Sequence, residues 1–99
     1  MVHVINLCEV FYDFLKRSDE DAANLAVEKV RSIGVIVRED MDDAFWQQAG
    51  RYKAQYRIPL PDAFALSLAD RFGAEIVTSD RRDFEPIART GACRVTFIR

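Results

Sequence analysis

Short runs of β-branched residues alternate with longer amphipathic segments along this chain, a pattern typical of strands followed by helices. Enrichment in Val, Ile and Thr predicts strands at residues 2–5, 35–37, 75–78 and 95–97. Apolar residues at helical spacing predict five helices, which begin at Asn6, Asp19, Asp42, Asp62 and Phe84. Strands and helices that alternate in this order favour an α/β domain with a mostly parallel sheet.

Glycine and proline residues mark where the predicted helices end. Gly34, Gly73 and Gly91 each follow an apolar helical segment, and glycine suits the left-handed turn that ends many helices. Pro59 and Pro61 interrupt the third predicted helix and open the fourth, because proline needs no amide hydrogen in the first turn.

Length and composition limit the fold further. A chain of 99 residues can bury about two thirds of its surface, which suffices for one hydrophobic core, so we expect a single domain over residues 1–99. With 49% hydrophobic and 30% charged residues, the chain is neither disordered nor fibrous. We recognise no stretch of membrane-spanning length and no export signal, and we expect a cytoplasmic protein with no membrane partner.

Charge is distributed unevenly along the chain. Residues 1–50 carry a net charge of −5 and residues 51–99 one of +3, which gives −2 in total. A mildly acidic protein does not bind nucleic acid through bulk release of counterions. A nucleic-acid substrate is still compatible with this balance if metal ions screen the carboxylates and arginines in the second half hold phosphates.

The cysteines and the histidine carry little functional signal. Cys8 and Cys93 lie at opposite ends of the chain, which excludes a CxxC redox or zinc motif, and we expect two buried free thiols. His3 is the single histidine and lies in a predicted strand, where a structural role is favoured over acid–base or metal chemistry.

Acidic residues are predicted at the carboxyl ends of strands, where parallel α/β sheets bind their ligands. Glu9 falls in the first turn of the first predicted helix, Asp62 opens the fourth, and Asp80 follows the strand at 75–78. Asp83 lies one helical turn beyond Asp80. Clustered carboxylates repel each other, so they either take up protons or bind a hard divalent cation such as Mg²⁺ or Mn²⁺.

Each of these acidic residues also has a structural interpretation. Asn6 and Glu9 have the spacing of a capping box, in which the Glu9 carboxylate reaches back to the Asn6 amide. Asp62 favours the positive end of a helix dipole. Asp80 suits an N-cap or an Asx turn, and Asp83 suits the N-cap of the last predicted helix. Spacing alone leaves both interpretations open.

Three segments, taken in order, resemble the acidic motifs of the PIN-domain ribonucleases. These segments are INLCEV at residues 5–10, LPDAFALSLA at 60–69 and IVTSDRRDF at 76–84, and the similarity extends over essentially all 99 residues. The resemblance implies a PIN-like, three-layer α/β/α fold with a mostly parallel sheet. The VapC-type toxins of bacterial toxin–antitoxin pairs are the subfamily that the chain resembles most.

The resemblance also implies a metal site. Glu9, Asp62 and Asp80 would be the catalytic residues and would hold one or two Mg²⁺ or Mn²⁺ ions. Asp83 would be a further ligand or an acceptor in the outer shell of the site. The ions would activate a water for in-line attack on an RNA phosphodiester.

Polar residues around the third motif complete this implied site. The hydroxyl of Thr78 or Ser79 would orient the attacking water. Arg81 and Arg82 would contact phosphates of the substrate through charge-assisted hydrogen bonds.

In one respect the chain departs from the family pattern, which begins with a central strand that ends in an aspartate. The sequence starts where the family's second strand starts. We therefore expect a fold that lacks the first strand and its helices, and a site that lacks the first carboxylate. The unpaired strand edges would be covered by closure of the remaining strands or by a second chain.

Two functions follow from the resemblance. The first is a metal-dependent endoribonuclease of the VapC toxin type, weak or incomplete without the first carboxylate, with an antitoxin protein as partner and a homodimer as the assembly. The second is a non-catalytic PIN remnant that acts as a dimerisation or antitoxin-binding module. A phosphoacceptor domain is disfavoured, because it needs a lysine after a late strand and Lys16, Lys29 and Lys53 all lie in predicted helices.

Overall fold

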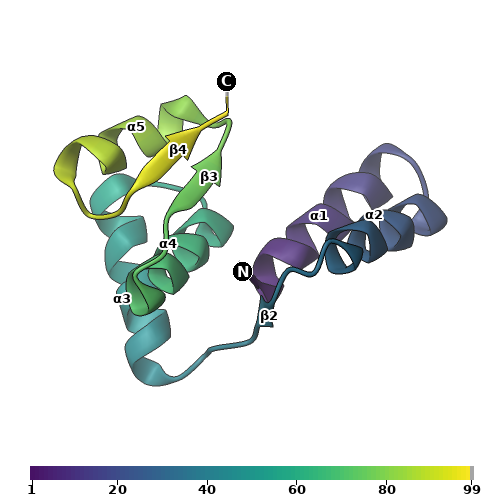
Figure 1. Ribbon diagram of the computed structural model, residues 1–99, viewed down its shortest axis with the longest axis horizontal. Helices are drawn as coiled ribbons and strands as arrows, with labels where there is room; N and C mark the ends of the chain where they lie inside the picture. The colour runs from purple at the N-terminus through teal and green to yellow at the C-terminus, as the bar shows by residue number, and fades with distance from the viewer. Residues whose placement is uncertain (99) are drawn as a thin grey trace. The chain divides into compact units, whose positions relative to one another are not determined.

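Residues 1–98 are described by this computed structural model, and within them the chain forms two compact units that meet in sequence after Asp40. Each unit combines one pair of parallel strands with its own helices (Figure 1). Parallel pairing agrees with the sequence-based prediction. The described strands pair two by two, whereas we expected one mostly parallel sheet.

A helical hairpin makes up most of the first unit. Strand β1 (Val2–His3) leads directly into helix α1 (Val4–Arg17), which packs against α2 (Glu20–Ser32) before the chain reaches β2 (Val37–Arg38). The two strands run parallel, with Val2 opposite Val37. Burial is limited in this unit, where Leu7 and Ala23 are the buried apolar residues of the two helices.

His3 determines where β1 ends and α1 begins. Its side chain is fully buried, and its Nδ1 accepts a hydrogen bond from the Ile5 amide at 3.1 Å, so that His3 is the N-cap of α1. Its Nε2 lies 2.8 Å from the Asp40 carbonyl oxygen, to which it donates because Nδ1 is already an acceptor. The helix therefore starts before Asn6, which makes the predicted strand at residues 2–5 too long and the predicted capping box wrong.

Three helices and the second strand pair form the other unit. In chain order they are α3 (Asp43–Tyr56), α4 (Leu60–Phe72), β3 (Ile76–Thr78), α5 (Arg81–Thr90) and β4 (Val95–Phe97). Strand β3 pairs with β4 in parallel, and α3 packs along α4. The predicted ends of two helices are confirmed, since Gly73 and Gly91 are the left-handed C-caps of α4 and α5.

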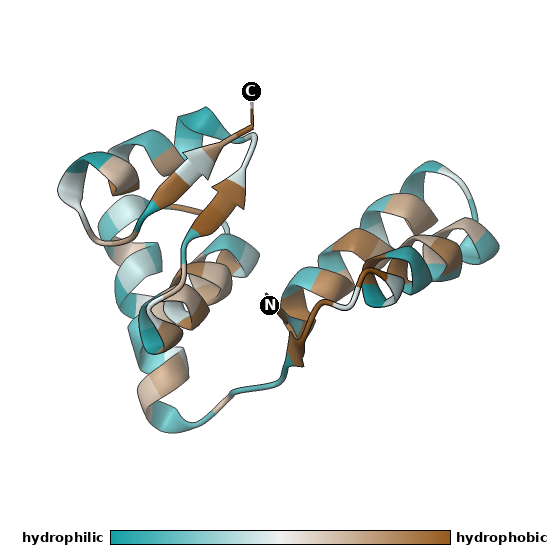
Figure 2. Cartoon of the chain, viewed as in Figure 1, coloured by the Kyte–Doolittle hydropathy of each residue, from teal (hydrophilic) through white to brown (hydrophobic). Residues whose placement is uncertain are grey.

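Most of the hydrophobic core lies in this second unit. Its fully buried large side chains include Phe45, Ile58, Leu66 and Ile87. The ring of Phe45 stacks on that of Phe64 with centroids 5.8 Å apart, which joins α3 to α4. Hydrophobic residues are concentrated in β3 and along parts of α1 and α4, as the brown segments of Figure 2 show.

The cysteines differ from expectation in one respect. Both are free, as expected, but Cys8 is exposed and Cys93 is only half-buried, so the prediction of two buried thiols is wrong. No helix within residues 1–98 combines the length and the apolar character that crossing a bilayer requires.

An ion pair holds the start of α3 to the end of α4. Asp42 occupies the predicted N-cap position of α3, but its carboxylate makes no capping hydrogen bond. It instead accepts two hydrogen bonds from the Arg71 guanidinium, at 2.6 and 2.7 Å. These bonds lower the pKa of Asp42 below its usual value of 3.8.

The Asp42→Asn variant tests this ion pair. Because the folded-state pKa is lowered, the pair adds stability above the unfolded-state value near 3.8, and that stability is lost as the pH falls through the folded-state pKa. We expect wild type to be more stable than Asp42→Asn at neutral pH and the difference to vanish in acid. Urea unfolding over a pH series measures it. A difference that is independent of pH would contradict the assignment.

Candidate functional site

Three carboxylates converge in the second unit. Asp62, Asp80 and Asp83 each offer one carboxylate oxygen, and these three oxygens all lie within 4.8 Å of one another. All three side chains are half-buried. Residues that are far apart in the sequence thus come together at the start of α4 and the start of α5.

Proline positions Asp62 in the first turn of α4. Pro59 is the N-cap of this helix with an extended backbone (φ −58°, ψ 152°), and Pro61 follows within the first turn. Asp62 is therefore the third helical residue, in the first turn as the sequence predicts, where the helix dipole favours a negative charge.

The end of β3 positions Asp80. Its amide donates to Thr78 Oγ1 at 3.0 Å, and its Oδ1 accepts from the Asp83 amide at 3.1 Å. Asp80 is thus the N-cap of α5, which confirms that structural interpretation. The helix begins at Arg81 rather than at Phe84, so that the alternative of Asp83 as an N-cap is wrong.

Crowding raises the energy of the charged state of this cluster. The pKa of Asp83 is raised, first because partial burial removes water from its carboxylate and second because the Asp80 carboxylate is close and bonded to it. Arg82 opposes this effect. Three hard oxygen donors with mutual repulsion are a donor set suited to Mg²⁺ or Mn²⁺, which would neutralise the repulsion.

Glu9 belongs to the first unit. It is the sixth residue of α1 and is exposed, and it is not in the first turn as we predicted, because the helix starts at Val4. Its pKa is raised by partial desolvation and by the negative charge of Asp13. The role of Glu9 as a metal ligand and catalytic residue stays a prediction.

The predicted substrate-binding residues occupy different surroundings. Thr78 is half-buried and accepts the Asp80 amide through its hydroxyl, whereas Ser79 is exposed. Arg81 pairs with Glu85 at 3.2 Å, and its guanidinium lies 4.6 Å from the centre of the Phe97 ring.

Arg82 faces an open depression beside the carboxylates. This depression has a volume of about 440 Å³ and is lined by Lys53, Arg57, Ile58, Pro59, Asp80, Arg82 and Asp83. Lys53 and Arg57 were not among the residues predicted for the site. Their position just before the Pro-containing turn that leads to Asp62 is the one signal that could have indicated them.

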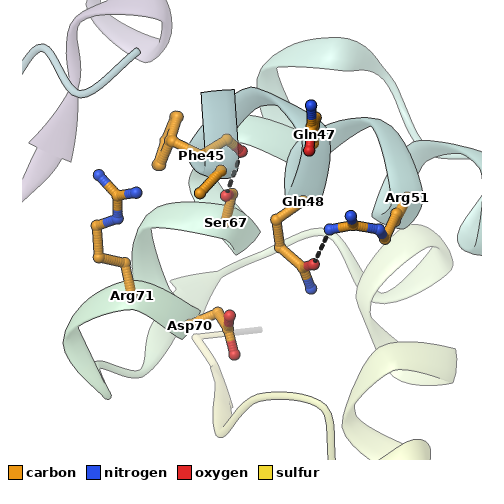
Figure 3. Close-up of a pocket in the computed structure, with 8 residues that line it drawn as sticks. Phe45, Gln47, Gln48, Arg51, Ser67, Asp70 and Arg71 are labelled. Atoms are coloured by element: carbon orange, nitrogen blue, oxygen red, sulfur yellow. Dashed lines mark hydrogen bonds between the residues drawn. The ribbon is translucent and has the colours of Figure 1, made fainter. Parts of the chain in front are cut away.

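A second depression, of about 330 Å³, lies between α3 and α4 and contains none of the predicted site residues. Figure 3 shows two hydrogen bonds among the residues that line it. Arg51 donates to Gln48 at 2.9 Å, and the Ser67 hydroxyl donates to the Phe45 carbonyl at 2.9 Å. Arg71 is occupied by Asp42.

An acidic cluster at a parallel strand end and two helix starts defines this chain as a small α/β protein with a candidate divalent-metal centre. The family model of the PIN domain matches residues 1–90, so the chain belongs to the PIN domain family. Members of this family are generally nucleases that act on RNA or other nucleic acids, typically with divalent metal ions. Comparisons with curated proteins and with solved structures returned no match.

The metal site predicts a stabilisation that depends on the cluster. A bound ion stabilises the folded state by about 2.7 kcal/mol at a hundredfold excess over its Kd. We expect Mn²⁺ to raise the Tm of wild type and to have a much smaller effect on Asp62→Asn and Asp80→Asn. Asparagine caps helices as well as aspartate does, so Asp80→Asn removes a ligand charge without removing the cap.

Asp70→Asn is the matched control for this experiment. Asp70 lies on the same helix as Asp62 but is exposed and lines the second depression. Differential scanning calorimetry of the four proteins with and without Mn²⁺ gives the comparison. Equal Tm shifts in all four would show that the ion binds elsewhere.

Proposed function

We propose that this protein is a Mg²⁺- or Mn²⁺-dependent endoribonuclease of the VapC toxin type. The observation that carries the proposal is the convergence of the Asp62, Asp80 and Asp83 carboxylates in a chain of the PIN domain family. The order of the three sequence motifs supports the same subfamily.

In this proposal the acidic residues hold the ion and the neighbouring groups hold the substrate. Asp62, Asp80 and Asp83 are the ligands in the second unit, and Glu9 is proposed as a further ligand. When bound, the ion supplies Lewis acidity toward a phosphate and lowers the pKa of a water. The Asp80 cap bond to the Asp83 amide, at 3.1 Å, orients one carboxylate before any ion binds.

Hydroxyl and guanidinium groups take the remaining roles. Thr78 accepts the Asp80 amide, so its own hydroxyl hydrogen is free to donate to a water or to a phosphate oxygen. Ser79 is exposed next to it and offers a second hydroxyl. Arg82 lines the depression beside Asp80 and Asp83 and is proposed to contact the phosphate there. Arg81, whose guanidinium pairs with Glu85, is proposed as a second phosphate contact.

The assembly and partners belong to the same proposal. The PIN match runs through both compact units, which supports a single functional domain over residues 1–99. Large apolar side chains of α1 and α2 are exposed, among them Tyr12, Leu15 and Leu25. Such side chains are typical of a surface that another chain covers, and we propose a cytoplasmic homodimer that also binds an antitoxin protein.

RNA cleavage by purified protein tests the proposed activity. Wild type with Mn²⁺ or Mg²⁺ is expected to cut single-stranded RNA, and chelation of the metal is expected to abolish the cleavage. Loss of one ligand charge in Asp62→Asn should slow cleavage by about a hundredfold or more. Asp70→Asn should cleave at the rate of wild type.

Two outcomes would contradict the proposal in different ways. Undiminished cleavage by Asp62→Asn would show that the acidic cluster is not the active site. No cleavage by wild type in any concentration of either metal, together with a stable dimer in light scattering, would favour a non-catalytic PIN protein that acts as a dimerisation or antitoxin-binding module.

A further inference from the structure

Basic side chains share the depression with the acidic cluster. Lys53 and Arg57 come from the end of α3 and the turn after it, and Arg82 comes from α5. With Asp80 and Asp83 in the same lining, cations outnumber carboxylates there. The lining itself thus carries a net charge of +1, and the Asp62 carboxylate lies within 4.8 Å of the two carboxylates in it, so a cation at the cluster would leave this region positive.

Lys53 is held in place over the turn. Its Nζ donates to the Ile58 carbonyl oxygen at 3.0 Å, which fixes the ammonium close to Pro59 at the edge of the depression. One of its three N–H bonds is used in this way, and two are left for another acceptor. The side chain is therefore partly ordered before a ligand binds, which reduces the entropy that binding costs.

Arg57 adopts a backbone conformation that normally favours glycine. It is the C-cap of α3 with φ 55° and ψ 38°, whereas α4 and α5 end with Gly73 and Gly91 in the same region. A side chain at this position is strained, because its Cβ crowds the following carbonyl oxygen. Within residues 1–98 the structure gives the Arg57 guanidinium no hydrogen bond or ion pair.

The second depression provides a contrast. Arg51 is bonded to Gln48 there (Figure 3), and Arg71 is bonded to Asp42. A guanidinium with free donors presents a planar pair of N–H groups that matches two oxygens of a phosphate, and an ammonium adds a point charge beside it. Phosphate is thus the ligand chemistry that suits Lys53 and Arg57.

We propose that Lys53 and Arg57 bind a backbone phosphate of single-stranded RNA, adjacent to the phosphate held at the acidic cluster. This inference rests on the proposed function, which supplies RNA as the ligand. The two residues position the strand so that the scissile phosphate lies at Asp62, Asp80 and Asp83, and they take no part in bond breaking. They are substrate-binding residues that sequence motifs do not indicate.

Binding of a short fluorescein-labelled single-stranded RNA, followed by fluorescence anisotropy in a chelator, tests the proposal without cleavage. Arg57→Gly removes the guanidinium and suits the left-handed backbone, so its Tm should be no lower than that of wild type. Lys53→Met keeps the aliphatic stem. Each variant should bind about fivefold more weakly than wild type.

The dependence of RNA affinity on salt concentration supplies a second readout. A variant that is only less stable would not change the slope of this dependence. Each lost phosphate contact should reduce the slope of log Kd against log salt concentration by about 0.7 for a single strand. Arg89→Ala is the matched control, because Arg89 lies on α5, has 75% of its side-chain surface exposed and does not line the depression. It should bind RNA like wild type.

The possible results separate this inference from the proposed nuclease activity. Equal affinity and equal slope for Arg57→Gly, Lys53→Met and Arg89→Ala would overturn the phosphate site, even if wild type cleaves RNA through Asp62. Absence of RNA binding by wild type would also overturn it. Weakened binding in the two variants, in a protein that cleaves no RNA, would support the phosphate site while the nuclease proposal fails.

Discussion

Electrostatic repulsion among Asp62, Asp80 and Asp83 is the constraint on which the rest of the site depends. At a separation of 4 Å and an effective dielectric constant of 20, two such charges repel by about 4 kcal/mol. The fold offsets part of this cost by placing all three at the starts of helices, where the helix dipole favours negative charge, and the Asp83 amide donates a hydrogen bond to Asp80. Desolvation and the neighbouring Asp80 carboxylate still raise the pKa of Asp83, and a bound cation would relieve this cost.

The structural and the functional interpretations of Asp80 are compatible. Its Oδ1 accepts the Asp83 amide and caps α5, and the carboxylate as a whole still offers an oxygen to the cluster. The same bond fixes the carboxylate relative to Asp83, which a metal site needs before its ligands can converge. The same orientation of the Asp80 carboxylate thus suits both helix capping and metal binding. For this reason the sequence pattern at Asp80 does not distinguish a cap from a ligand.

Helix ends that depend on the backbone preference of a single residue were predicted correctly. Helix starts that depend on a side chain bonded to a later backbone amide were predicted less well. Gly73 marks the end of α4 as predicted, because its backbone preference is intrinsic, whereas the helix starts at Leu60 after Pro59, two residues before the predicted start at Asp62. The start of α1 was missed, because it depends on a hydrogen bond from the Ile5 amide to His3. Asp80 was an N-cap candidate and is the N-cap of α5, although the helix itself was expected to start only at Phe84. Which strand pairs with which depends on contacts between distant residues, and no local pattern gave the two separate pairs.

Lys53 and Arg57 could not be predicted as site residues from the sequence, because exposed basic residues at a helix end usually just face solvent. Their meaning depends on Asp80 and Asp83, which lie far along the chain and line the same depression. A phosphodiester is itself negative, so three carboxylates alone would repel the RNA substrate that we propose. A divalent ion bound at the cluster would cancel most of that charge, and the basic residues that line the neighbouring depression would add positive charge beside it. Lys53, Arg57 and Arg82 supply part of the positive balance of residues 51–99, and they lie beside two of the acidic residues of the cluster.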